Sequence, residues 1–131
     1  VRSYKKKPFW IMEQQAGIAG WGTMARALDP GQMSVWAMQS VAHGADAVVF
    51  FRWRACAMGT EQYWHGILGH SGKPGRTYEE AKKLIHTFAP HMDEFEGAMP
   101  KPEVAIVHSF RQNYAFQIQP NHPDLRYVEH L

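Results

Sequence analysis

The sequence predicts an α/β fold built on parallel strands, and three observations support this prediction. Two short apolar runs, 9–12 and 47–53, have the length and composition of buried strands. Each run is followed by a segment with apolar residues at helical spacing. The resulting order of strand, helix, strand, loop and helix is typical of a parallel sheet with right-handed crossover connections.

The first strand leads directly into Glu13, and the first helix is expected to begin at residues 29–31. Asp29 would cap this helix and Pro30 would take its first position, where the missing N–H costs nothing. Gly44 is expected to end the helix. An apolar stripe would face the sheet, formed by Met33, Trp36, Ala37, Ser40 and Val41.

The second helix is expected to begin at Thr77, which together with Glu80 matches a capping box. Pro90 lies at the expected end of this helix. Its apolar stripe would consist of Tyr78, Ala81, Leu84, Ile85 and Phe88.

A stretch with two prolines and a glycine at 97–102 predicts a linker between two domains, 1–96 and 103–131. Residues 104–107 would form the first strand of the second α/β domain, and residues 124–128 would form the first turns of a helix. The two strands of the first domain cannot close a sheet on themselves. Their apolar edges are therefore expected to pair with other strands, which favours oligomerisation.

The composition argues against several classes of partner. The formal net charge is +2, and the basic run 2–7 has the character of a solvated tail, so no nucleic-acid binding is expected. No apolar run approaches the roughly 20 residues that span a bilayer, so no membrane partner is expected. Cys56 is the only cysteine, which excludes an internal disulfide and suits a reducing cytoplasm. The 8 histidines have no metal-ligand spacing, so neither a metal nor another cofactor is expected.

Glu13 is the first candidate for a catalytic residue. A carboxylate that directly follows a buried parallel strand lies at the carboxyl edge of the sheet, where parallel barrels place their catalytic groups. Residues 14–17 leave the core and enter a glycine-containing loop, so the carboxylate would project into a cleft. The alternative is a glutamate at a strand end that is only solvated at the surface.

Several separated motifs follow one another along the chain. They are Pro8-Phe9-Trp10-Ile11-Met12-Glu13-Gln14, Trp21, Pro30-Gly31-Gln32, Ala42-His43-Gly44-Ala45-Asp46, Phe51-Arg52-Trp53-Arg54 and Glu61-Gln62. This set resembles the region around strands seven and eight of family 42 glycoside hydrolases, the β-galactosidases, over residues 8–90 and more weakly over 104–120. The resemblance implies a partial (β/α)8 TIM barrel, made of its last two βα units, followed by the start of a trimerisation domain. A homotrimeric parent enzyme is therefore expected.

The resemblance also implies a mechanism. Glu13 would be the nucleophile of a retaining enzyme that hydrolyses terminal β-D-galactosides, with a galactoside or an oligosaccharide as substrate. Retaining hydrolysis needs a second carboxyl group roughly 5 to 5.5 Å away as the acid/base. In the family this group follows an Asn at the end of strand four, upstream of the residues present here. The chain alone is therefore expected to be inactive.

Other residues are expected to contact the sugar, and each has a structural alternative. Trp21 matches a family tryptophan that packs against the sugar, but it could instead fold onto the core. Glu61 matches a sugar-binding acid, although it could also cap a short helical turn. The family has a histidine three residues after this acid, where Trp64 stands here, so its role would fall to His65 or to Trp64.

Arg52 and Arg54 lie at the end of the second predicted strand. Alternate residues of a strand share a face, so both side chains would point the same way, and one could lie close enough to Glu13 to keep it ionised. They could equally pair with structural carboxylates. Arg111 stands about where relatives carry an acidic residue, which bears on the expected trimer interface.

Two interpretations from other functional classes are also open. The chain could be a noncatalytic carbohydrate-binding module that keeps Trp21, Trp64 and Glu61, or it could be an assembly domain without a sugar site. A surviving sugar site predicts a change in Trp fluorescence with galactose, whereas an assembly domain predicts none.

Overall fold

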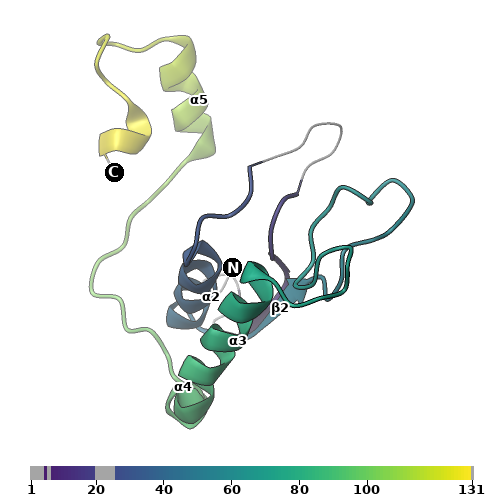
Figure 1. Cartoon of the computed structure of the whole chain (residues 1–131). Coiled ribbons are helices and arrows are strands. Elements are labelled where there is room, and N and C mark those ends of the chain that lie inside the picture. The colour runs from purple at the N-terminus through teal and green to yellow at the C-terminus, as the bar shows by residue number, and fades with distance from the viewer. Residues whose placement is uncertain (1–4, 6, 20–25, 131) are drawn as a thin grey trace. The chain divides into compact units, whose positions relative to one another are not determined.

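The structure is a computed structural model that describes residues 5, 7–19 and 26–130, without the side chain of residue 130. Trp21 lies outside the described residues. The chain divides into two compact units, Val1–Pro100 and Lys101–Leu131 (Figure 1). The assignment of these units to a barrel and a trimerisation domain stays a prediction. No helix among the described residues is long and apolar enough to cross a membrane.

The sheet of the first unit has two parallel strands, β1 (Phe9–Gln15) and β2 (Ala45–Phe51). The prediction of an α/β unit with parallel strands is therefore confirmed. The limits differ, because β1 runs on through Glu13 to Gln15, and β2 begins and ends two residues earlier than expected. Arg52 consequently lies beyond the end of its strand and not within it.

The register of the two strands is irregular around Glu13. Ile11 pairs with Val48 and Gln14 pairs with Phe50, so β1 advances three residues while β2 advances two. One extra residue on one strand is the definition of a β-bulge, which bends the strand and changes the direction of a side chain. Met12 and Glu13 occupy this bulge.

Helix α2 (Gln32–Ala42) begins differently from the prediction, because Asp29 does not cap it. A turn closed by the Gln32 N–H to the Asp29 carbonyl (3.1 Å) precedes the helix, and Gly31 in this turn has a φ of 86°. A positive φ favours glycine at the third position of such a turn. The Asp29 carboxylate instead accepts two hydrogen bonds from Arg26, at 2.8 and 3.0 Å.

The C-terminus of α2 agrees with the sequence. The helix ends at Ala42, and Gly44 follows with a φ of 88° and donates its N–H to the Val41 carbonyl at 2.8 Å. A left-handed glycine after the last turn is the usual way to satisfy terminal carbonyls. The chain then enters β2 at Ala45 without a further loop.

Helix α3 (Arg76–Phe88) forms as expected, but the predicted capping box of Thr77 and Glu80 does not form. Gly75 is the N-cap, and no side chain caps the helix. The Glu80 carboxylate accepts a hydrogen bond from the Gly31 N–H (3.1 Å), and its other oxygen lies 3.5 Å from an Arg76 nitrogen. Glu80 therefore connects the starts of α2 and α3 and is not available for Thr77.

The apolar stripe of α3 is narrower than expected. Ala81 and Leu84 are buried, whereas Ile85 is 62% exposed, so its assignment to the core is wrong. Two short helices, η1 (Ala89–His91) and α4 (Met92–Phe95), continue beyond α3.

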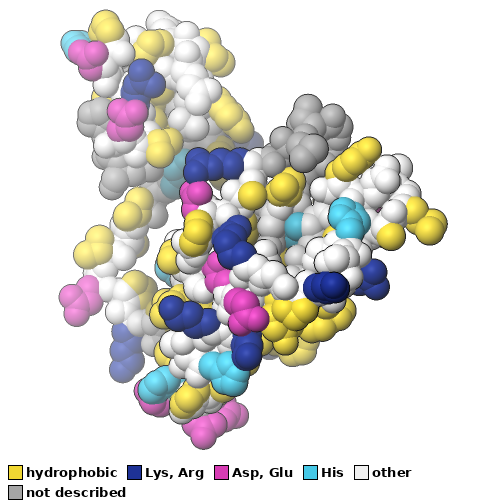
Figure 2. Space-filling view, viewed as in Figure 1, with side chains coloured by type: hydrophobic (Ala, Val, Ile, Leu, Met, Phe, Trp, Pro, Cys, Tyr) yellow, Lys and Arg dark blue, Asp and Glu magenta, His cyan; other side chains and the backbone are white. Residues whose placement is uncertain are grey.

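The core of the first unit lies where α2 packs against both strands and against α3 (Figure 1). Its buried members are Ala16, Leu28, Met33, Ile67 and Ala81, with Trp36, Phe50 and Tyr78 packed around them. Other large apolar side chains are exposed, as the yellow areas of Figure 2 show on one face. Trp10, Met12 and Trp53 are each more than 60% exposed. A two-stranded sheet with two helices leaves much of its apolar surface uncovered.

The second unit consists of α5 (Phe110–Ile118) and η2 (Tyr127–His130). The predicted strand at 104–107 is wrong, since this segment has no regular secondary structure and Val107 is 81% exposed. A strand needs a neighbour to satisfy its backbone groups, and the described residues offer none here. The helix expected at 124–128 is replaced by the later single turn of η2.

Candidate functional site

Glu13 lies two residues before the end of β1, within the bulge, and its side chain is exposed. Because β2 runs parallel beside β1, the carboxyl ends of both strands meet at the same edge of the sheet. The sequence predicted Glu13 directly after the strand, whereas in the structure Glu13 lies within β1, two residues before its end. A bulge next to an active site is a common way to redirect one side chain.

The chain that follows β1 is tightly held. Ala16 is 1% exposed, and the Gln15 side chain donates a hydrogen bond to the Gly17 carbonyl. A Cβ built on Gly17 would lie only 2.6 Å from the Cβ of His65, so glycine is needed for this approach. The loop after Glu13 is thereby packed directly against the segment that carries His65.

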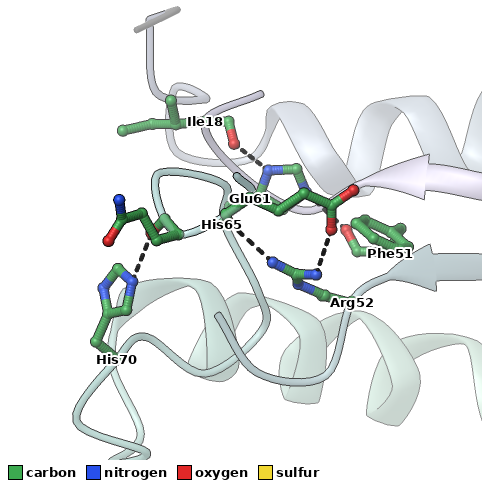
Figure 3. Close-up of polar contacts among 7 residues, drawn as sticks. Ile18, Phe51, Arg52, Glu61, His65 and His70 are labelled. Atoms are coloured by element: carbon green, nitrogen blue, oxygen red, sulfur yellow. Dashed lines mark hydrogen bonds and ion pairs between the residues drawn. The ribbon is translucent and has the colours of Figure 1, made fainter. Parts of the chain in front are cut away.

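The imidazole of His65 contacts backbone atoms from two chain segments. Its Nε2 lies 2.6 Å from the carbonyl oxygen of Phe51, and its Nδ1 bonds the carbonyl oxygen of Ile18 (Figure 3). The same Nε2 lies 3.0 Å from the backbone nitrogen of Ala16. The N–H of His65 also donates to Ile18, at 3.0 Å. Both ring nitrogens are therefore occupied by the protein, which leaves His65 poorly suited to bind sugar hydroxyls itself.

Arg52 and Glu61 form an ion pair in the loop after β2 (Figure 3). The Arg52 Nη1 lies 2.7 Å from the Glu61 Oε2, and its Nη2 donates to the Glu61 carbonyl at 3.1 Å. Both side chains are partly exposed, at 21% and 34%. The guanidinium also lies over the ring of Phe51, 5.1 Å from its centroid, so three contacts hold it in place.

Arg52 and Arg54 lie beyond the end of β2, so the alternation of side chains along a strand, from which a shared face was predicted, does not apply to them. Arg54 donates to the His70 carbonyl at 3.0 Å and packs beside Gly72. The described hydrogen-bond partners of the two side chains, Glu61 and His70, belong to the 61–72 loop and do not include Glu13.

Trp64 packs among aromatic rings at the end of β2. Its ring meets Phe51 edge-on, with centroids 5.9 Å apart, and lies nearly parallel to the His65 ring, at 8° and 6.5 Å. The side chain is half-buried, so part of the indole surface remains accessible.

The structure thus gathers four of the predicted site residues in the loop after β2, namely Arg52, Glu61, Trp64 and His65. Glu13 lies on the neighbouring strand. The backbone contacts of His65 to Ala16 and Ile18 were not foreseen, because partners 47 to 49 residues apart leave no local pattern. Within the described residues, no three His, Cys, Asp or Glu side chains converge as a metal site.

A shallow pocket of about 360 Å³ lies in the second unit and involves none of these residues. It is lined by Asn113, Phe116, Gln117, Pro120, Pro123, Leu125, Arg126, Tyr127, Val128 and Glu129.

Comparison with known proteins connects this geometry to one family. The family model of glycoside hydrolase family 42, described as β-galactosidase, matches residues 1–90. β-Galactosidase BgaA of Clostridium cellulovorans is 41% identical over 100% of this chain and 20% of its own length. β-Galactosidase BgaH of Haloferax lucentense is 42% identical over 99% of the chain and 19% of its own. The chain thus spans about a fifth of the length of the curated relatives that it matches.

Solved structures give the same result. The polyextremophilic β-galactosidase from the Antarctic haloarchaeon Halorubrum lacusprofundi matches 98% of the chain and 19% of its own, with a TM-score of 0.67 and 36% identity. The β-galactosidase from Bacillus circulans sp. alkalophilus matches 94% of the chain and 18% of its own, with a TM-score of 0.71 and 30% identity. The chain therefore belongs to glycoside hydrolase family 42.

Proposed function

We propose that this chain supplies the nucleophile strand of a retaining β-galactosidase, with Glu13 as the nucleophile. Membership of the family supports the proposal, and so does the one geometric observation that matters most. Glu13 is an exposed carboxylate in a bulge near the carboxyl end of β1, and β2 runs parallel beside it. In parallel barrels this end of the strands is the end that bears catalytic groups.

In this mechanism a carboxylate oxygen of Glu13 attacks the anomeric carbon of a terminal β-galactoside. The bond between that carbon and the leaving oxygen breaks, while an acid protonates the leaving oxygen. Water then hydrolyses the glycosyl ester and releases galactose with its configuration retained. The acid is expected on a strand upstream of these residues, so polypeptide 1–131 alone should not turn over substrate.

The loop after β2 would hold the sugar beside Glu13. Arg52 fixes one carboxylate oxygen of Glu61 at 2.7 Å, which leaves the other oxygen directed by the same ion pair and able to accept a bond from a sugar hydroxyl. Trp64 offers an indole face, and Trp21 would add another, since aromatic faces suit the C–H face of galactose. His65 would influence this site indirectly, through its contacts with the backbone of Ala16 and Ile18.

The architecture and setting of the parent protein belong to the same proposal. Strands β1 and β2 with α2 and α3 would be the last two βα units of a TIM barrel, and residues 103–131 would begin a trimerisation domain. The open edges of a two-stranded sheet support this, because edges of this kind need further strands. We also infer a homotrimeric enzyme, and the single Cys56 supports a cytoplasmic location.

The test uses a chimaera in which residues 1–131 replace the matching segment of the full-length Clostridium cellulovorans enzyme. Glu13→Gln should lower kcat for a chromogenic β-galactoside by on the order of 10⁴-fold or more, because a neutral amide cannot form the glycosyl ester. Galactose binding should persist. The matched control is Glu79→Gln, which changes an exposed glutamate on α3 and should leave kcat unaltered.

A second measurement separates loss of the nucleophile from misfolding. In Glu13→Ala, azide should restore cleavage by attacking the anomeric carbon from the vacated face and should yield the α-galactosyl azide. Full activity of Glu13→Gln, or no rescue by azide in a folded Glu13→Ala, would remove Glu13 from the nucleophile role. A folded, sugar-binding and inactive parent chimaera would favour the carbohydrate-binding interpretation.

A further inference from the structure

We propose that His65 is a positioning residue that fixes the backbone after Glu13 against the end of β2, and thereby holds the nucleophile in line. This inference rests on the proposed function of Glu13 and adds a role that is distinct from sugar binding. The supporting observation is that one imidazole joins the chain after β1 to the chain at the end of β2, as Figure 3 shows for Ile18 and Phe51.

The ring reaches the segment that directly continues from the nucleophile. Ala16, three residues after Glu13, presents its N–H to the His65 Nε2 at 3.0 Å, and Ile18 bonds both the Nδ1 and the N–H of His65. Ala16 is 1% exposed, so its N–H cannot exchange this partner for water without cost. His65 therefore fixes two alternate residues of the loop that leaves β1.

Each ring nitrogen of His65 has a backbone partner. Nδ1 faces the Ile18 carbonyl, and Nε2 lies within hydrogen-bond distance of both the Ala16 nitrogen (3.0 Å) and the Phe51 carbonyl oxygen (2.6 Å). Because one ring nitrogen cannot accept and donate at the same time, Nε2 bonds either Ala16 as an acceptor or Phe51 as a donor. In either case the ring lies between the chain after β1 and the end of β2.

His65 can act as a fixed point because its own backbone is rigidly attached. Residues 65–68 lie along residues 52–55, with the Ile67 N–H donating to the Arg52 carbonyl and the Leu68 N–H donating to the Trp53 carbonyl, both at 2.7 Å. A Cβ on Gly66 would lie 2.5 Å from the Ala55 nitrogen, so the two segments touch at the backbone. The position of β2 is in this way transmitted to the imidazole.

A fixed loop matters for a nucleophile because attack depends on distance and direction. A misplacement of about 1 Å can cost roughly 100-fold in rate. Glu13 lies in a bulge, where the regular hydrogen bonds of the ladder do not define its position, so the contacts just beyond the strand carry more of that task. Loss of the His65 contacts should therefore slow the attack and leave the affinity for the sugar unchanged.

Two amide variants of the chimaera test which ring nitrogen matters. The amide of Gln extends to about the position of Nε2 and can accept from Ala16, whereas the shorter amide of Asn reaches only the position of Nδ1. His65→Gln should keep kcat within about 3-fold, and His65→Asn should lower it by roughly 10- to 100-fold. The KM should stay within about 2-fold in both, because no sugar contact is removed.

Gly17→Ala gives the same test without changing His65. The new Cβ would lie 2.6 Å from the His65 Cβ, so the imidazole must move away from the loop. The kcat should again fall by roughly 10- to 100-fold with an unchanged KM. This variant remains informative where His65→Asn fails to fold.

Covalent trapping distinguishes failure of this inference from failure of the proposed function. A 2-deoxy-2-fluoro-galactoside with a good leaving group should label Glu13 in the unaltered chimaera, and His65→Asn and Gly17→Ala should label the same residue more slowly by the factor seen in kcat. A label on another residue would overturn the role of Glu13. Labelling of Glu13 at an unchanged rate, or a rise in KM in place of the fall in kcat, would overturn the positioning role of His65 alone.

Discussion

Each of the two units of the chain is stabilised internally by a different kind of interaction. Among the described residues, the buried apolar side chains lie in Val1–Pro100, and none after Pro100 is buried. The second unit relies on individual contacts. The Tyr127 hydroxyl accepts a hydrogen bond from the Ser109 N–H at 2.9 Å, and the rings of Phe116 and Tyr127 stack with centroids 5.9 Å apart.

The difference shows which sequence signals need distant partners. A helix of nine residues such as α5 is marginal by itself, so its cap and its few ring contacts decide whether it forms. In the first unit, by contrast, α2 and α3 are stabilised by burial against each other and against the sheet. Substitutions in the first unit should therefore act on the whole unit, and substitutions in the second should act locally.

The largest expected effect on stability is at Met33, which is 1% exposed in the core of the first unit. Met33→Ala should lower the free energy of unfolding of polypeptide 1–131 by about 2–5 kcal/mol, through lost burial and a cavity. Urea unfolding followed by circular dichroism measures the change. Met38 on the same helix is 49% exposed, and Met38→Ala should cost less than about 0.5 kcal/mol. Equal losses at both positions would mean that the core does not form in the isolated chain.

The sequence predicts the first unit well where the signal is periodic and the partner is a whole surface. The parallel strands, the helices α2 and α3, and the glycine at the end of α2 follow from apolar spacing and one backbone requirement. The details fail where a distant group competes with a local one. Glu80 could not cap α3 through Thr77 because the Gly31 N–H, 49 residues away in sequence, takes its carboxylate.

The candidate site likewise has features that follow from the local sequence and features that depend on distant parts of the chain. Glu13 near a strand end and Glu61 in the next loop could be proposed from the order of motifs. The contacts of His65 with Ala16 and Ile18, and the different hydrogen-bond partners of Arg52 and Arg54, depend on how loops fold back onto the strand ends. No spacing along the chain encodes such contacts.

The opposite holds in the second unit. Its local capping residue, Ser109, marks a helix that forms, whereas its apolar run, 104–107, does not form a strand. The apolar run 104–107 forms no strand, whereas α5 was missed although Ser109 stands at its start. The Ser109 side chain accepts a hydrogen bond from the Gln112 N–H at 3.3 Å, which is the usual geometry of an N-cap serine. A cap acts within four residues, so it operates even where no core is present.

Removal of this cap gives the next prediction in size. Ser109→Ala should destabilise α5 by about 1 kcal/mol, because the Gln112 N–H loses its acceptor. Hydrogen exchange of the α5 amides in polypeptide 1–131 should accelerate by roughly 5-fold, with no change in β1 or β2. Ser109→Asp keeps an acceptor and complements the helix dipole, so it should preserve the protection. Equal exchange in the Ala and Asp variants would show that α5 does not depend on its cap.

The smallest effect is expected at Val107, and it tests why the apolar run fails to form a strand. Its side chain is 81% exposed, so Val107→Ser in polypeptide 1–131 should change the free energy of unfolding by less than about 0.5 kcal/mol. Val48→Ser, which changes a half-buried residue of β2 paired with Ile11, should cost more in the same urea titration. In the full-length chimaera, where further strands could pair with 104–107, Val107→Ser should shorten the half-life of thermal inactivation. Neutral behaviour in both settings would mean that the run 104–107 stays outside any sheet, and that its apolar side chains serve a different contact.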